Sequence, residues 1–210
     1  MQFSNALKKT LLSIGLLSSQ VHADPLPPSD SVPASSSIFS LDAKVGAFFL
    51  LNSSTRELYG SVLPAFTIEG NANVYKGLTL WLDGSYILGN GGNSYGSSHL
   101  NFIPLSLGLK YAYSIIESLD FYAGAGPCYS FLITRDHSPY VHEKNSSNNW
   151  GFVAKSGFIY HCANYLQVEG FVDYMYQQFH FANTEKDPFV YRSDAFLNGI
   201  EVGASIGYNF

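Results

Sequence analysis

Apolar and polar residues alternate along most of the chain from Leu41 to Phe210, the period-two pattern of a β-strand whose two faces meet different surroundings. In the stretch 41–51, for example, every second residue from Leu41 onward is apolar. The alternation predicts eight strands, at about 41–51, 61–75, 78–89, 100–114, 118–134, 150–162, 165–179 and 197–210.

The predicted connections alternate between short and long. Tight turns follow the second, fourth and sixth strands, whereas long polar stretches follow the other four connected strands, at about 52–60, 90–99, 135–149 and 180–196. No helical pattern is found beyond the N-terminal region. We therefore predict an all-β fold, an eight-stranded antiparallel up-and-down barrel with two unlike ends.

The charged residues within these segments share one face. All ten fall opposite the apolar residues: Asp42, Lys44, Glu69, Asp83, Lys110, Asp120, Lys155, Glu169, Asp173 and Glu201. A soluble barrel turns its apolar face inward and leaves such charges in water, whereas a membrane barrel encloses them and turns the apolar face to lipid. Alternation alone does not separate these two architectures.

Aromatic and small residues favour the transmembrane β-barrel over a secreted, lipocalin-like one. Aromatic side chains gather on the apolar face near both ends of the strands, as in the two girdles of a membrane barrel. The proposed inner face is rich in glycine, which suits a narrow lumen packed around a few large side chains. The chain has no apolar run of about 18 residues, which excludes a helical membrane protein.

The N-terminal region has the three parts of a secretory signal. Lys8 and Lys9 precede a short apolar stretch, and Val21-His22-Ala23 supplies the small residues of a cleavage site. We predict a signal peptide over 1–23, a flexible periplasmic leader rich in Pro and Ser over 24–39, and a barrel domain over 40–210.

Topology, girdles and an alternating last strand that ends in Tyr208 and Phe210 resemble the small eight-stranded outer-membrane barrels of Gram-negative bacteria, such as the OmpA transmembrane domain, OmpX and OmpW. The resemblance implies a location in the outer membrane. It also implies that Tyr208 and Phe210 form the signal read by the barrel-assembly machinery.

Two interpretations of the interior remain open. Eight strands leave a lumen just wide enough for side chains, so we favour an ion-paired lattice over a water-lined ion path. The inward positions near the long loops are apolar: Phe48, Leu50, Leu63, Ile87, Phe102, Leu132, Val153 and Leu197. They form either a pocket for a small hydrophobic ligand, as the resemblance to OmpW implies, or a surface that packs against inward-folded loops.

No catalytic, metal or cofactor site is predicted. The Ser, His and acidic residues form no grouping on facing strand positions, and His99, His137, His142 and His180 are interpreted as solvated loop residues. Cys128 and Cys162 fall on opposite faces, which predicts two free thiols. A net charge of −5 argues against nucleic acid as a partner.

The sequence leads to two hypotheses about function. The first is a structural anchor in outer-membrane lipid that displays loops such as 136–149 to a host or envelope protein. The second is a narrow channel or binding cup for small hydrophobic molecules.

Overall fold

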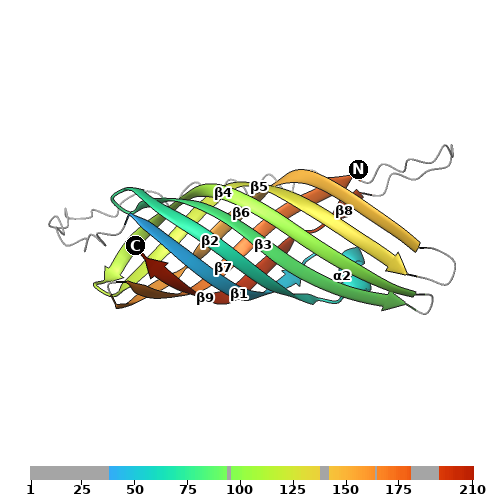
Figure 1. Cartoon of the computed structure of the whole chain (residues 1–210), viewed down its shortest axis with the longest axis horizontal. Coiled ribbons are helices and arrows are strands. Elements are labelled where there is room, and N and C mark those ends of the chain that lie inside the picture. The colour runs from blue at the N-terminus through green and yellow to red at the C-terminus, as the bar shows by residue number, and fades with distance from the viewer. Residues whose placement is uncertain (1–37, 94–95, 138–141, 164, 181–193) are drawn as a thin grey trace, which may run out of the picture. The chain divides into compact units, whose positions relative to one another are not determined.

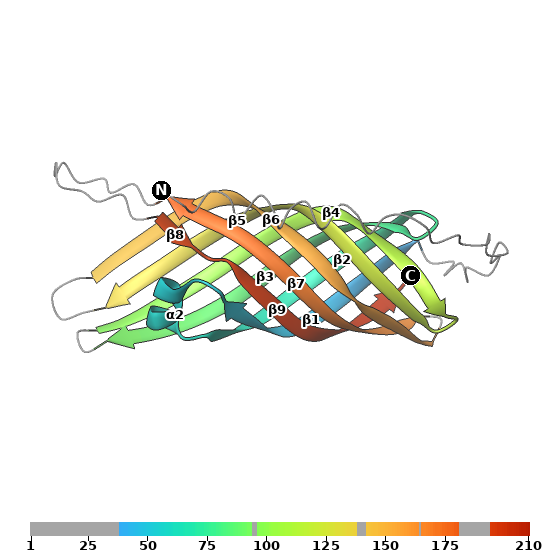
Figure 2. The same cartoon turned by 180° about the vertical axis from the view of Figure 1, so that it is seen from behind.

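Eight long antiparallel strands form a closed barrel in the computed structural model, which describes residues 38–93, 96–137, 142–163, 165–180 and 194–210 (Figures 1 and 2). The long strands are β1 (Phe39–Leu50), β2 (Val62–Tyr75), β3 (Leu78–Asn93), β4 (Gly96–Ile116), β5 (Leu119–His137), β6 (His142–Ala163), β7 (Leu166–His180) and β9 (Gly199–Asn209). A further short strand, β8 (Asp194–Phe196), precedes β9. The predicted all-β, up-and-down architecture is confirmed. The predicted signal peptide and nearly all of the predicted leader lie outside the described residues.

The last strand closes the barrel. Each of β1 to β7 pairs with its neighbour in the chain, and β9 pairs with both β7 and β1. The short β8 pairs with β7 in the same register as β9, from Gln178↔Phe196 to Met175↔Gly199, so it prolongs the last strand toward the loop end. A complete ring of strand pairs leaves no unpaired sheet edge around the barrel wall.

The short connections lie at one end of the barrel, as predicted. Lys76 and Gly77 join β2 to β3, and Gly77 has a φ of 74°, a left-handed conformation that favours glycine. The β4–β5 and β6–β7 connections are similarly short. Figure 1 shows the end of β9 on this side and α2 on the other.

The hairpins at the loop end are longer than predicted. The stretch 135–149 was expected to be a loop, but β5 and β6 remain paired from Leu119↔Tyr160 to His137↔His142. The strands β3 and β4 likewise continue through most of 90–99, to Asn93↔Gly96. These extensions are rich in Ser, Asn and Gly on both faces, so they lack the apolar alternation on which the prediction relied, although the backbone still pairs.

The connection between β1 and β2 contains a helix, α2 (Ser53–Tyr59), where no helix was expected. The side chain of Asn52 accepts hydrogen bonds from the backbone N–H groups of Ser54 and Thr55, at 3.0 and 3.3 Å. At the other end Gly60 has a φ of 87°, and its N–H donates to the carbonyl of Arg56. Asn before a helix is an ordinary start signal and Gly after it an ordinary stop signal, but seven residues are too few to show an apolar period. No helix in the described part of the chain is long and apolar enough to span a bilayer.

The two faces of the barrel wall have the predicted phase. Ile68 is 64% exposed on the outside, whereas the next residue, Glu69, is fully buried on the inside. The same alternation leaves Leu82, Leu109 and Ile206 exposed. The barrel therefore has an apolar exterior around a charged interior, the inverse of a soluble barrel.

Aromatic side chains mark both ends of this apolar exterior. Near the loop end, the ring of Tyr129 lies 5.0 Å from that of Trp150 and 5.1 Å from that of Phe131. At the turn end, the Tyr208 ring lies 5.0 Å from Phe210, and the backbone N–H of Phe210 donates to the carbonyl of Phe39. The two clusters lie near opposite ends of the barrel, an arrangement like that of the aromatic girdles of membrane barrels.

Candidate functional site

Nine of the ten predicted interior charges are buried inside the barrel. We call them the charge network: Asp42, Lys44, Glu69, Asp83, Lys110, Lys155, Glu169, Asp173 and Glu201. Asp120 does not join them. It lies at the turn end, only partly buried, where its Oδ2 atom is 2.9 Å from Nε2 of His161.

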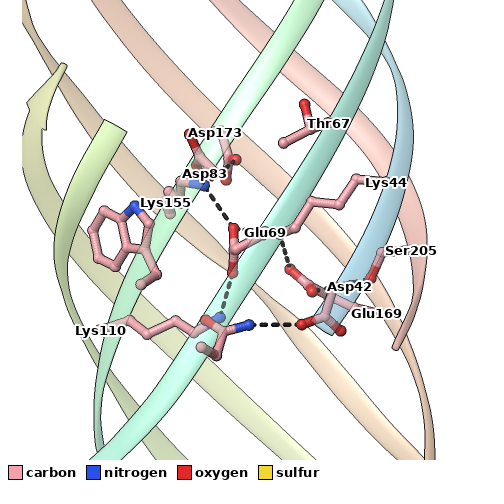
Figure 3. A network of polar contacts seen from close by, with 12 residues as sticks. Asp42, Lys44, Thr67, Glu69, Asp83, Lys110, Lys155, Glu169, Asp173 and Ser205 are labelled. Atoms are coloured by element: carbon pink, nitrogen blue, oxygen red, sulfur yellow. Dashed lines mark hydrogen bonds and ion pairs between the residues drawn. The ribbon is translucent and has the colours of Figure 1, made fainter. Parts of the chain in front are cut away.

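Glu69 is the centre of the charge network (Figure 3). Its carboxylate accepts hydrogen bonds from Lys110 and Lys155, each at 2.7 Å, and forms an ion pair with Lys44 at 3.0 Å. The three lysines come from β4, β6 and β1, so one side chain of β2 connects four strands across the lumen. A buried carboxylate needs such compensation, because charge removed from water is costly when it is unpaired.

Other acids share the same lysines. The ammonium group of Lys44 donates to Glu169 at 2.8 Å, and that of Lys155 donates to Asp83 and lies 3.7 Å from Asp173. Glu169 also accepts from the hydroxyl groups of Tyr122 and, at 3.1 Å, Ser205. The contacts between lysines and acids thus join β1, β2, β3, β4, β6 and β7.

Each lysine also lies over an aromatic ring that rests on a glycine. The pairs are Lys44 over Phe171 at 4.8 Å, Lys110 over Tyr122 at 4.8 Å and Lys155 over Trp81 at 5.3 Å. The rings lie against the predicted inward glycines: Gly203, Gly157 and Gly108 respectively. The absence of a Cβ lets each ring lie close to the wall, and the ring face stabilises the ammonium charge.

Asp42 lies on the turn side of the charge network, and neutral side chains, not a lysine, donate hydrogen bonds to its carboxylate. Its carboxylate accepts from the side-chain amides of Asn71 at 2.6 Å and Gln167 at 2.8 Å, and from Ser40 at 3.3 Å. Neutral donors therefore satisfy this buried acid.

The apolar residues near the loop end form a second layer, which we call the apolar plug: Phe48, Leu50, Leu63, Ala65, Ile87, Leu100, Phe102, Leu132, Met175, Phe179 and Leu197. Seven of the eight predicted pocket residues belong to it. The eighth, Val153, is buried and lines a small cavity beside the charge network. Ala65, Leu100, Met175 and Phe179 were not predicted to belong to this layer, although the alternation in their strands places all four on the inner face.

The apolar plug is packed and covered from the loop end. The Phe102 ring lies 6.2 Å from Phe48 and 6.0 Å from Phe179, the latter edge to face. Tyr59 of α2 packs against these residues, and its hydroxyl is 2.9 Å from that of Ser98. In a second contact the Thr55 hydroxyl donates to the carbonyl of Phe196 at 3.1 Å, near the start of the helix. A residue of the β1–β2 connection therefore packs against the apolar plug.

Little space remains between the two layers. A cavity of about 10 Å³ is lined by residues of both, among them Phe48, Lys155, Asp173 and Glu201. That volume is close to the smallest that holds a single water molecule. The described interior charges are thus buried and ion-paired, and the cavity beside them has room for about one water molecule.

The other candidate groups are scattered. Cys128 is buried, Cys162 is exposed and both are free, as predicted. His99 is exposed and bonds to Asn90 at 2.7 Å, whereas the side chains of His137, His142 and His180 lie outside the described residues. No group of His, Cys, Asp and Glu in the described part of the chain has the arrangement of a metal site.

Comparisons with known proteins concern the fold. No family model and no curated protein sequence matches the chain. Among solved structures, OprG, an outer-membrane protein of Pseudomonas aeruginosa, is 14% identical, with a TM-score of 0.61 over 82% of this chain and 95% of that one. Neisserial surface protein A is 15% identical, with a TM-score of 0.59 over 83% of this chain and 98% of that one. The barrel therefore has the fold of small outer-membrane barrels, as the resemblance implied.

Proposed function

We propose that this protein is an outer-membrane barrel of a Gram-negative envelope, a non-catalytic anchor that presents its loop-end hairpins for contact with a host or envelope protein. The observation that carries the proposal is the inverted barrel: an exposed apolar wall around a filled, ion-paired lumen.

The apolar wall supports a location in lipid. Exposed side chains such as Ile68 and Leu82 would be in contact with water if the barrel were soluble. In a bilayer the same surface is favourable, and a Lys or Arg on it would cost about 2–4 kcal/mol at the midplane. The aromatic clusters around Trp150 and Tyr208 then lie at the two interfaces.

The orientation follows from the unequal ends. Outer-membrane barrels have short periplasmic turns and longer extracellular loops. By this rule the Lys76–Gly77 turn faces the periplasm, and α2 and the long hairpins face outward. The predicted signal peptide supports export, and the aromatic pair Tyr208 and Phe210 supports assembly by the barrel-assembly machinery.

The long hairpins supply a surface for contact. The β5–β6 pairing continues beyond Tyr129↔Trp150, at the loop-side girdle, to His137↔His142. The backbone of a paired hairpin is already ordered, so binding to a partner costs less conformational entropy than it does for a long open loop. A filled lumen suits a protein whose function lies in this projecting part.

The location and the anchor role can be tested in one set of experiments. On intact cells, protease should cut only sites at the loop end, and the unheated protein should migrate as a compact barrel in SDS. In planar bilayers the purified protein should show no stable single-channel current, because the charge network and the apolar plug fill the lumen. Steady conductance steps would contradict the filled-lumen anchor.

A second candidate function is the binding of a small hydrophobic molecule at the loop end. The apolar plug favours it, because sites for small hydrophobic molecules are lined mostly by apolar side chains and occur in the mouths of β-barrels. Uptake of a hydrophobic probe into proteoliposomes should then fall when Phe102 is changed to Asp and persist when the exposed Tyr86 is changed to Phe. Unchanged uptake in Phe102→Asp would exclude this function.

A further inference from the structure

The charge network contains more acids than bases. Within the described residues, the buried charged side chains are the six acids Asp42, Glu69, Asp83, Glu169, Asp173 and Glu201 and the three lysines Lys44, Lys110 and Lys155. Asp42 has its own neutral donors, and Glu69, Asp83 and Glu169 each have a close lysine. The remaining two acids, Asp173 and Glu201, lie next to each other.

Asp173 and Glu201 are direct cross-strand partners on β7 and β9. Their side chains are on the inner face, more than nine-tenths buried, and both line the cavity between the network and the plug. Like charges that face each other on adjacent strands are destabilising, and burial strengthens the repulsion. Two ionised carboxylates at this position would therefore need a positive charge between or beside them.

The lysines of the charge network do not neutralise both the Asp173 and the Glu201 carboxylates. Lys155 is the nearest cation, 3.7 Å from Oδ2 of Asp173, but its ammonium group already bonds to Glu69 and Asp83. Oδ1 of Asp173 and Oε1 of Glu201 have no hydrogen-bond partner. Oε1 of Glu201 is close to the backbone of Gly46, where a Cβ would be 2.9 Å away, so the wall contributes no donor side chain there.

We propose that Asp173 and Glu201 form a buried proton-binding site, in which one carboxyl group is protonated and donates to the other directly or through one water molecule in the cavity. The bound proton supplies the missing donor and removes one of two facing negative charges. Both acids titrate as a coupled pair, so the proton belongs to the pair and not to one residue.

Other charged and titratable groups act on this pair from the surrounding strands: Lys44 of β1, Glu69 of β2, Asp83 of β3, Tyr122 of β5, Lys155 of β6 and Glu169 of β7. The two lysines are shared with Glu69, Asp83 and Glu169, so the surroundings do not offset a second negative charge on the pair. Loss of the proton at alkaline pH should therefore weaken the packing at the boundary between the network and the plug.

Infrared spectroscopy of the full chain in detergent micelles tests the site directly. At neutral pH the protein should show the carbonyl stretch of a protonated carboxylic acid, and Glu201→Gln should remove that intensity. Asp120→Asn is the matched control, because Asp120 bonds to His161 outside the network and should contribute nothing to the band. A band that is unchanged in both Glu201→Gln and Asp173→Asn would overturn the proposal.

Unfolding measured as a function of pH gives a second readout. A proton held in the folded state and released on unfolding makes the barrel less stable as pH rises, with an unfolding equilibrium constant that increases up to about tenfold per pH unit. In Glu201→Gln the unfolding equilibrium constant should no longer increase with pH.

Two results would refute the proton site even if a variant fails to fold. One is a wild-type barrel whose unfolding does not change from mildly acidic to mildly alkaline pH. The other is a wild type that has no protonated-acid band and loses stability when sodium is replaced by choline, which would place a metal cation at the pair.

Discussion

The charge network and the apolar plug fill the same barrel by opposite means. In the charge network each side chain must meet a particular atom, as Glu69 meets the ammonium groups of three lysines. In the apolar plug the side chains need only fill volume, as Phe102 does between Phe48 and Phe179. The charge network and the apolar plug meet where Phe48 of β1 is the cross-strand partner of Glu201 of β9.

This difference has a consequence for tolerance to mutation. A hydrogen-bonded buried charge loses its compensation when one partner is neutralised, even if the shape is kept. An apolar layer tolerates a change between hydrophobic residues of similar volume. Conservative substitutions should therefore be costly in the network and mild in the plug.

The largest effect is expected at Glu69. Glu69→Ala leaves three buried ammonium groups without their shared carboxylate and should destabilise the barrel by about 3–5 kcal/mol. Even Glu69→Gln, which keeps the shape, should be clearly destabilising. The measurement is urea unfolding in lipid vesicles, followed by the fluorescence of Trp81 and Trp150. Asp120→Asn is the control and should cost no more than about 1 kcal/mol, because its ion pair is partly exposed.

The corresponding change in the plug is Phe102→Ala. The ring is fully buried, so its loss should create a cavity and cost about 3–4 kcal/mol in the same assay. Phe102→Leu should cost only about 1–1.5 kcal/mol, since much of the volume is kept. If Phe102→Leu were as harmful as Glu69→Gln, the proposed difference between the two layers would be wrong.

A smaller effect is expected at the glycines of the barrel wall. In Gly108→Ala the new Cβ would lie 2.6 Å from the carbonyl oxygen of Ala125 and against the Trp81 ring, so we expect a loss of about 1–3 kcal/mol. Gly70→Ala is the control, because its nearest neighbour would be 3.9 Å away. That variant should change the free energy of unfolding by no more than about 0.5 kcal/mol. If Gly108→Ala and Gly70→Ala changed the free energy of unfolding equally, the position of the Trp81 ring would not depend on a glycine at residue 108.

The smallest effect is expected at α2, the helix whose Tyr59 packs against the apolar plug. Asn52→Ala removes the N-cap of α2 and should cost about 1 kcal/mol of local stability. Hydrogen exchange should quicken at the amides of Ser54 and Thr55, while the unfolding midpoint of the barrel stays nearly unchanged. Slow exchange at these amides in the variant would mean that Tyr59 and Thr55 hold the helix without its cap.

The prediction of the fold succeeded where one face of a strand differs from the other. Within the barrel wall each strand has an exposed apolar face and a buried inner face that carries the charges, and this contrast produced the alternation. It failed at the β5–β6 extension, where both faces are polar, and at α2, where local capping replaces an apolar period. The alternation placed Asp120 on the correct face of its strand. It does not give the position of a residue along the barrel axis, so it did not show that Asp120 lies apart from the charge network.

The sequence by itself determined which side chains point inward, because alternation assigns every residue of a strand to a face once one of them is assigned. Only the tertiary structure decided which inward side chains meet. Lys44 and Glu169 are 125 positions apart in the chain and 2.8 Å apart in the lumen, a contact set by the closure and stagger of the strands. The same geometry brought Asp173 opposite Glu201 and placed Tyr59 over the apolar plug, because barrel closure fixes the height of each residue along the axis.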